Sequence, residues 1–324
     1  MLFRSLQTDE SNIYQYENNS SKFAPCYPIT LNNTPFIIYH KERYIIKAGF
    51  WDCRLEINAL LTEADKKEKE EYISQTIFTP YCGPIIILKM TSDEKLLFCG
   101  TKDGNIIIFN VNGPILEKKK ILYSHSGQIT SLTINENLNM FASSSIDGYV
   151  NLYILPSFSI IRSIQISKKD KIDINECLYA DNIFLSSSPL PCFVIYILVL
   201  KIFKIYSING ELIGKVEEEK DSGNIKFPLI FQNLNFNDFL IYGTKDGFVK
   251  IRSFPNMNLI SSIKPFEGQE IKTLELSPDK RFCYAWSHKD KIAVIKDINT
   301  STGFEVKEES NEHEETLMEK IGGE

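Results

Sequence analysis

The residue types best suited to chemistry lie close together in the middle of the chain, at His125, Ser145 and Asp147. They are the types of a nucleophilic triad, in which a histidine takes the proton of a serine while a carboxylate orients the ring. An aspartate recurs at the same place in four related segments that lack a matching histidine and serine. Catalysis would not require that recurrence, so we interpret the three residues as structural and predict that the protein is not an enzyme.

The sequence also gives no sign of a metal or cofactor site. The four histidines, His40, His125, His288 and His313, fall into neither an H-x-H nor an H-E-x-x-H pattern. The glycine-rich patterns G-x-x-x-x-G-K-[ST] and G-x-G-x-x-G, which cradle phosphates, do not occur. We therefore predict no metal and no cofactor.

Charge is concentrated at one end of the chain. The 324 residues contain 36 Lys+Arg and 42 Asp+Glu, a net charge of −6. Residues 299–324 hold two lysines against eight glutamates, so this segment accounts for the imbalance and the rest is about neutral. A neutral body does not attract polyphosphate, which argues against nucleic acid as the main partner. We expect 299–324 to be an acidic disordered tail.

The aspartates belong to a repeated element that aligns without gaps. Each copy has a small residue, two variable positions, an aspartate, two more positions and then apolar residues spaced by two. Such a segment is typical of a tight turn that leads into a half-buried strand. The five aspartates are Asp52, Asp103, Asp147, Asp246 and Asp290.

The spacing of the repeats predicts a fold. Successive aspartates are mostly 44 to 51 positions apart, and the one long interval leaves room for a degenerate unit near residue 200 with Leu200 in place of the aspartate. Apolar runs before each turn indicate further strands, whereas helical repeats would need apolar spacings of three and four. Four-stranded units with this period are typical of a β-propeller. We predict an all-β protein with six recognisable blades, and seven in a complete ring.

Two features bear on the compartment. The N-terminus is too polar for a signal peptide, and the apolar run Cys192–Leu200 is far shorter than the roughly 20 residues that span a bilayer, so we expect buried strands there. The seven cysteines are scattered, without a C-x-x-C pair, and indicate reduced core thiols. We expect a cytoplasmic protein.

The third unit resembles a WD repeat. Its sequence SHSGQITSLTINENLNMFASSSIDGYVNLY has His125 at the Gly-His position, Ser143 or Ser145 in the strand and Asp147 in the turn. The resemblance implies a structural hydrogen-bond network, which we assign to His125, Ser145 and Asp147. In the family this network ends at a strand tryptophan, whose place is taken by Tyr153.

Other stretches resemble a narrower group. YIIKAGFWDCRLEI and KIFKIYSINGELIG are similar to segments of the propeller that follows the BEACH domain in neurobeachin-type proteins. The BEACH domain itself is absent, so the chain looks like a C-terminal fragment, a split gene product or a partial gene model. The resemblance implies a role in vesicle trafficking and membrane dynamics, with peripheral association at endomembranes through a BEACH domain or a partner.

These observations lead to three expected segments and one leading function. We expect a linker or closing strand at 1–35, a WD-repeat propeller at 36–298 and the tail at 299–324. The leading function is a non-catalytic scaffold for protein partners, BEACH-type in trafficking. The alternatives are a stand-alone WD-repeat adaptor of a multiprotein complex such as a ubiquitin ligase and, remotely, a propeller hydrolase. Trp51 and Trp286 either pack between blades or bind a partner at the rim.

Overall fold

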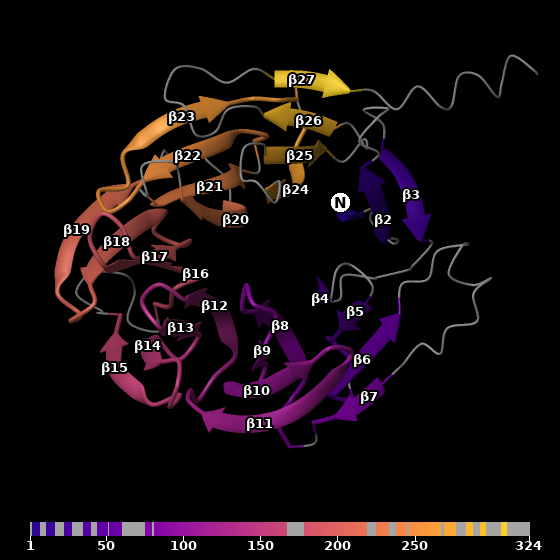
Figure 1. The fold of residues 1–324 in the computed structure, drawn as a ribbon. Helices are drawn as coiled ribbons and strands as arrows, with labels where there is room; N and C mark the ends of the chain where they lie inside the picture. The colour runs from indigo at the N-terminus through magenta and orange to yellow at the C-terminus, as the bar shows by residue number, and fades with distance from the viewer. Residues whose placement is uncertain are drawn as a thin grey trace, which may run out of the picture. The chain divides into compact units, whose positions relative to one another are not determined.

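The computed structural model is built from β-strands. It describes residues 2–6, 11–16, 23–27, 35–39, 44–50, 52–59, 75–79, 81–166, 178–218, 225–232, 238–244, 246–266, 269–276, 283–287, 292–295 and 306–309. These residues contain six four-stranded antiparallel sheets and one three-stranded sheet (Figure 1). The chain divides into two compact units, one at Asn33–Glu218 and one formed by Met1–Asn32 with Glu219–Glu324.

The unit at Asn33–Glu218 holds four sheets, each made of four strands in chain order. The sheets are β4 (Phe36–Tyr39), β5 (Tyr44–Lys47), β6 (Arg54–Ala59) and β7 (Gln75–Phe78); β8 (Ile85–Met90), β9 (Leu96–Thr101), β10 (Asn105–Asn112) and β11 (Ile115–Tyr123); β12 (Ile129–Asn135), β13 (Met140–Ser145), β14 (Tyr149–Ile154) and β15 (Ile160–Gln165); and β16 (Asn182–Ser186), β17 (Cys192–Ile197), β18 (Ile202–Ser207) and β19 (Leu212–Glu217).

The second unit holds three sheets. They are β1 (Leu2–Leu6), β2 (Ser11–Tyr16) and β3 (Phe23–Tyr27); β20 (Ile225–Gln232), β21 (Asp238–Thr244), β22 (Val249–Ser253) and β23 (Leu259–Ile263); and β24 (Ile271–Leu276), β25 (Cys283–Ser287), β26 (Ile292–Ile295) and β27 (Val306–Glu309).

Within the Asn33–Glu218 unit, the β8–β11 and β12–β15 sheets bury both faces against neighbouring sheets, and the two end sheets each bury one face in this way. The first strands lie side by side in the order β4, β8, β12 and β16. Alternating residues of β9 face opposite ways: Leu97 joins the core shared with the β4–β7 sheet, and Phe98 joins the core shared with the β12–β15 sheet. On β14, Tyr153 packs toward the β8–β11 sheet and Leu152 toward the β16–β19 sheet. The period-2 alternation therefore supplies both interfaces of a sheet.

The fourth strand of each sheet is different, because it lies on the outer side of this unit and is largely exposed (Figure 1). Ile160 and Ile161 of β15 and Leu212 and Ile213 of β19 are exposed despite being apolar. A strand in this place needs no alternation of apolar residues. The sequence pattern therefore predicted three strands in each repeat and gave no specific signal for the fourth.

Two described parts of the chain form strands outside the range 36–298 that was expected for the propeller. Among the described strands, β1 pairs with β2 and closes no four-stranded sheet, and residues before position 35 form the three-stranded β1–β3 sheet. The last sheet takes its fourth strand from β27, which lies inside the segment expected to be a disordered tail. A glutamate-rich sequence can form such a strand because an outer strand does not have to bury apolar side chains. The remainder of 299–324 lies outside the described residues.

The degenerate fourth repeat forms a regular sheet. Its turn, Leu198–Lys201, has no aspartate or glycine, and Lys201 adopts a positive φ of 52° while its amide donates to the Leu198 carbonyl at 3.1 Å. The Leu198 amide donates to Asp181 Oδ2 at 2.7 Å, so a carboxylate from the segment before β16 holds the turn. The run Cys192–Leu200 thus provides strand β17 and most of this turn. In the described residues, no helix is long and apolar enough to cross a membrane.

The structure describes the side chains of five of the seven cysteines, and none of these five forms a disulfide. Cys82, Cys99, Cys192 and Cys283 are buried, and Cys53 is half-buried. Burial raises the pKa of the Cys99 thiol, so it stays protonated and packs as an apolar group.

Gly104 shapes the loop that carries His125. It follows Asp103 in the turn between β9 and β10, has a φ of 85° and accepts the His125 amide hydrogen at 3.2 Å. A Cβ at this position would overlap the main-chain carbonyl of His125. Only glycine combines this backbone conformation with so close an approach of the next loop.

The Gly104→Ala variant should therefore lose roughly 2–3 kcal/mol of unfolding free energy, from the left-handed backbone and from the displaced loop. Chemical denaturation followed by circular dichroism measures this loss. Gly214→Ala is the matched control, since Gly214 has no positive φ and its nearest neighbour is the flexible Ile205 Cδ1 at 3.4 Å. Equal losses in the two variants would contradict the role given to Gly104.

Candidate functional site

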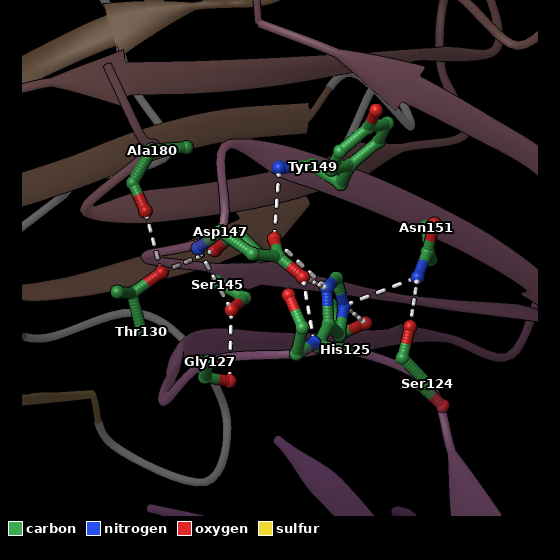
Figure 2. A network of polar contacts seen from close by, with 12 residues as sticks. Ser124, His125, Gly127, Thr130, Ser145, Asp147, Tyr149, Asn151 and Ala180 are labelled. Carbon is green, nitrogen blue, oxygen red and sulfur yellow. Dashed lines mark hydrogen bonds and ion pairs between the residues drawn. The ribbon is translucent and has the colours of Figure 1, made fainter. Parts of the chain in front are cut away.

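The candidate site centres on His125, in the loop 124–128 between β11 and β12. Its Nδ1 lies 3.0 Å from Asp147 Oδ2 and 3.2 Å from Asp147 Oδ1 (Figure 2). Asp147 belongs to the turn between β13 and β14, and its carboxylate also accepts the amide hydrogens of Ser126 at 3.0 Å and Tyr149 at 2.9 Å. One carboxylate therefore fixes both the loop that enters the sheet and the hairpin inside it.

The other ring nitrogen of His125 faces the interior of the sheet. His125 Nε2 lies 2.8 Å from Ser143 Oγ, and Ser143 Oγ lies 3.1 Å from the Tyr153 hydroxyl. Asn151 Nδ2 lies 3.2 Å from the same ring nitrogen and donates to the Ser124 carbonyl at 3.0 Å. The contact with a carbonyl fixes the Asn151 amide nitrogen as the atom that faces the histidine.

The donors and acceptors assign one direction to the whole network. Since an ionised carboxylate only accepts, His125 Nδ1 carries a hydrogen and donates it to Asp147. Nε2 then accepts from Ser143 and from the Asn151 amide, which leaves Ser143 Oγ to accept from Tyr153. Every hydrogen in the series points toward Asp147, and the arrangement fits a neutral imidazole.

Ser145 occupies a different place from the one assigned to it. Its hydroxyl donates to the Gly127 carbonyl at 2.9 Å and accepts the Asp147 amide hydrogen at 3.2 Å, so it fastens loop 124–128 to the aspartate turn (Figure 2). Ser143 is the serine that contacts His125. Tyr153, at the place of the family's tryptophan, ends the series. Asn151 carries no signal in the sequence that would have revealed its part.

A further link joins this sheet to the next one in the same unit. The Thr130 hydroxyl lies 2.9 Å from Ser144 Oγ and donates to the Ala180 carbonyl at 2.5 Å (Figure 2). Ala180 lies directly before β16. The half-buried Thr130 hydroxyl therefore ties two neighbouring sheets together.

Burial governs the protonation of His125. Its side chain is fully buried, and loss of water lowers the pKa of the ring, an effect that the nearby Asp147 carboxylate offsets only in part. Protonation at Nε2 would also set a new N–H against the Asn151 amide donor. Since the unfolded chain binds this proton more tightly than the folded protein, acid favours unfolding through His125.

We expect the unfolding free energy to fall as the pH drops below about 6.5, the ordinary pKa of histidine. The His125→Gln variant, although less stable at pH 7, should show a shallower fall between pH 6.5 and pH 5 because it lacks the titrating ring. Urea titrations at fixed pH values measure both slopes. A steeper fall in the variant would mean that the folded protein holds the His125 proton more tightly than the unfolded chain.

The order Asp147, His125, Ser143 matches that of a serine nucleophile with its base and orienting acid. Ser143 is 0% exposed, however, and its second contact is the Tyr153 hydroxyl. No carbonyl of a substrate can reach a hydroxyl that is buried within the sheet in this way. The geometry therefore assigns the three groups a structural role.

A fluorophosphonate, which reacts covalently with activated serines, should leave the protein unmodified. Intact-mass spectrometry of the native chain and of the Ser143→Ala variant is expected to give no adduct for either. An adduct that forms on the native chain and disappears in the variant would instead make Ser143 a nucleophile.

The other repeat aspartates occupy equivalent turns with different contacts. Asp103 lies against Gly83 in the preceding loop, Asp52 accepts from Arg54 Nη1 at 2.5 Å, and Asp246 is exposed in the β21–β22 turn. Asp290 and Trp51 lie outside the described residues. Trp286 lies on β25, where its backbone is opposite Thr273 and Ile292. Among the described residues, no three His, Cys, Asp or Glu side chains gather as a metal site would require.

Comparisons with known proteins agree with this architecture. The family model described as WD domain, G-beta repeat, matches residues 116–153, a range that begins in β11 and ends in β14. The crystal structure of RRP9 WD40 repeats is 12% identical, with a TM-score of 0.61 over 84% of this chain and 78% of that one. The structure of U3-55K has the same identity, TM-score and coverage of this chain, and 79% of its own length is covered.

At this identity the likeness concerns the fold alone. The chain contains a WD40 repeat at residues 116–153 and has the fold of WD40 propellers. The all-β propeller predicted from the repeats is thereby confirmed, with six four-stranded sheets at the predicted places. The WD-repeat resemblance holds, whereas neither solved structure named above nor the family match carries a BEACH-type feature.

Proposed function

We propose that this protein is a non-catalytic scaffold that works as a WD-repeat adaptor in a multiprotein complex. The supporting observation is an exposed aromatic edge in the Asn33–Glu218 unit. The loops and turns at 81–84, 102–104, 123–128 and 146–148 meet in series, through contacts of Gly83 with Asp103, Gly104 with His125 and Gly127 with Ile146. We call this row of loops the aspartate edge.

Two tyrosines stand out from the aspartate edge. Tyr81 is 97% exposed and Tyr123 is 80% exposed, while Ile146 on the same edge is exposed as well. Large aromatic side chains are enriched in the centres of protein interfaces, where they bury much area at little entropic cost. The Asp147 carboxylate holds loop 124–128 and the 146–148 turn together, so this part of the edge is a preorganised surface.

The BEACH-type reading stands second. It rests on the stretches GFWDCRLEI and YSINGELIG in the sequence, and it would place the protein at endomembranes with a trafficking partner. The adaptor hypothesis is supported by the propeller fold and the exposed aspartate edge alone, so we place it first. A cytoplasmic location belongs to the same proposal. The hydrolase alternative would need an accessible nucleophile, and the serine that contacts His125, Ser143, is buried.

The tagged 324-residue chain, purified from its own cells at near-physiological salt, should elute well above its 37.2 kDa mass with a partner in near-equal amount. The Tyr81→Ser variant should lose at least tenfold of that partner. Leu190→Ser provides the control, because Leu190 is 62% exposed in the β16–β17 connection at the opposite end of the strands.

Elution of the native chain as a monomer without any stoichiometric partner would overturn the scaffold function. Loss of the partner in both variants alike would overturn the assignment to the aspartate edge.

A further inference from the structure

A cavity opens on the aspartate edge between the β8–β11 and β12–β15 sheets. Its volume is about 470 Å³, within the range of roughly 300–1,000 Å³ typical of ligand sites. The network around His125 forms part of the cavity wall, but its hydrogen bonds join protein groups to one another and leave the cavity itself without a structural role. The lining residues are Asn105, Tyr123, Ser124, His125, Ser126, Asp147, Tyr149, Asn151 and Ser163.

Two tyrosines from different sheets flank this cavity. Tyr123 ends β11 and is 80% exposed, and Tyr149 begins β14 and is 38% exposed. The Tyr149 amide is held by Asp147 while its ring is directed away from that carboxylate (Figure 2). Both rings are therefore available to stack on a planar or cationic group.

The most buried lining side chains offer an unused acceptor. Asn151 is 3% exposed, and its amide nitrogen is occupied by the Ser124 carbonyl and the His125 ring. Its Oδ1, by contrast, is buried without a hydrogen-bond partner in the described structure. A buried acceptor left unpaired costs about 1–3 kcal/mol. Because this oxygen is sealed from solvent in the structure, a donor in the cavity gains from it only when the Asn151 side chain turns toward the cavity.

Charge points to the same kind of ligand. Among the nine lining residues, all in the described part of the chain, Asp147 is the one with a formal negative charge, and none is a lysine or arginine. His125 is neutral in the tautomer assigned above. Anionic ligands are therefore disfavoured, and a cation with several hydrogen-bond donors is favoured.

We propose that this cavity receives an arginine side chain of a protein partner, an inference that rests on the scaffold function proposed above. A guanidinium is planar, stacks on tyrosine rings and carries five N–H donors in fixed directions. The acceptors among the lining residues include the Asp147 carboxylate and the hydroxyls of Ser126 and Ser163. A lysine ammonium would use the charge but not the stacking surface.

The probe is the peptide acetyl-Gly-Arg-Gly-amide, added to isotopically labelled full-length protein and followed by amide chemical shifts. Its citrulline analogue has the same shape without the charge. We expect the arginine peptide to shift the amides of Ser126, Tyr149 and Ser163, and the citrulline peptide to bind at least tenfold more weakly. The corresponding lysine peptide should fall between the two.

Variants at exposed positions, which preserve the fold, test whether the peptide binds at this cavity. The double variant Tyr123→Ala with Tyr149→Ala should weaken arginine-peptide binding at least fivefold. Leu190→Ala, which removes an exposed side chain at the opposite end of the strands and outside the cavity, should leave binding within twofold. Circular dichroism spectra of all three proteins should be the same.

Equal shifts with arginine and citrulline peptides, shifts at other places, or equal weakening by Leu190→Ala would each overturn the arginine site. A native chain that keeps its stoichiometric partner but ignores the arginine peptide would retain the scaffold function and lose this inference alone. A chain that binds the arginine peptide but has no stoichiometric partner would retain the arginine site and lose the scaffold function.

Discussion

The structure depends on the fact that a small four-stranded sheet has two apolar faces and cannot cover either by itself. In the Asn33–Glu218 unit, β9 supplies Leu97 to one core and Phe98 to the next, and β14 divides Leu152 and Tyr153 in the same way. The sheets in the interior of the row are therefore stable only between neighbours. Polar groups within such a stack must find partners locally, which explains the series of hydrogen bonds from Tyr153 to Asp147.

The sequence predicted those parts of the fold that burial controls. Strands with alternating apolar residues and the aspartate turns repeat because every sheet meets the same packing demand on both faces. The parts that it did not predict carry no such demand. The outer strands β15 and β19 are exposed, and β27 comes from a glutamate-rich segment, so apolar periodicity does not mark them. The β1–β3 sheet lies in a segment with no copy of the repeat.

The candidate site was also predictable only in part. His125 and Asp147 follow from the repeat pattern, and the structure brings them together. Ser143 and Ser145 lie two residues apart on one strand and point to the same face, so alternation could not distinguish them. Their contacts differ by position along the strand: Ser145 lies at the turn, whereas Ser143 pairs with Asn151 and lies near Tyr153. Only the register of β13 against β14 reveals which serine meets the histidine.

The turn between β17 and β18 shows how a repeat can lose its sequence signature without losing its geometry. There the carboxylate comes from Asp181, seventeen positions before the amide that it binds, instead of from the turn itself. The turn residues therefore need supply neither a carboxylate nor a glycine, since Asp181 binds the amide and Lys201 adopts the positive φ. Where a distant residue makes a contact that is usually local, a count of repeats by motif will underestimate the number of sheets.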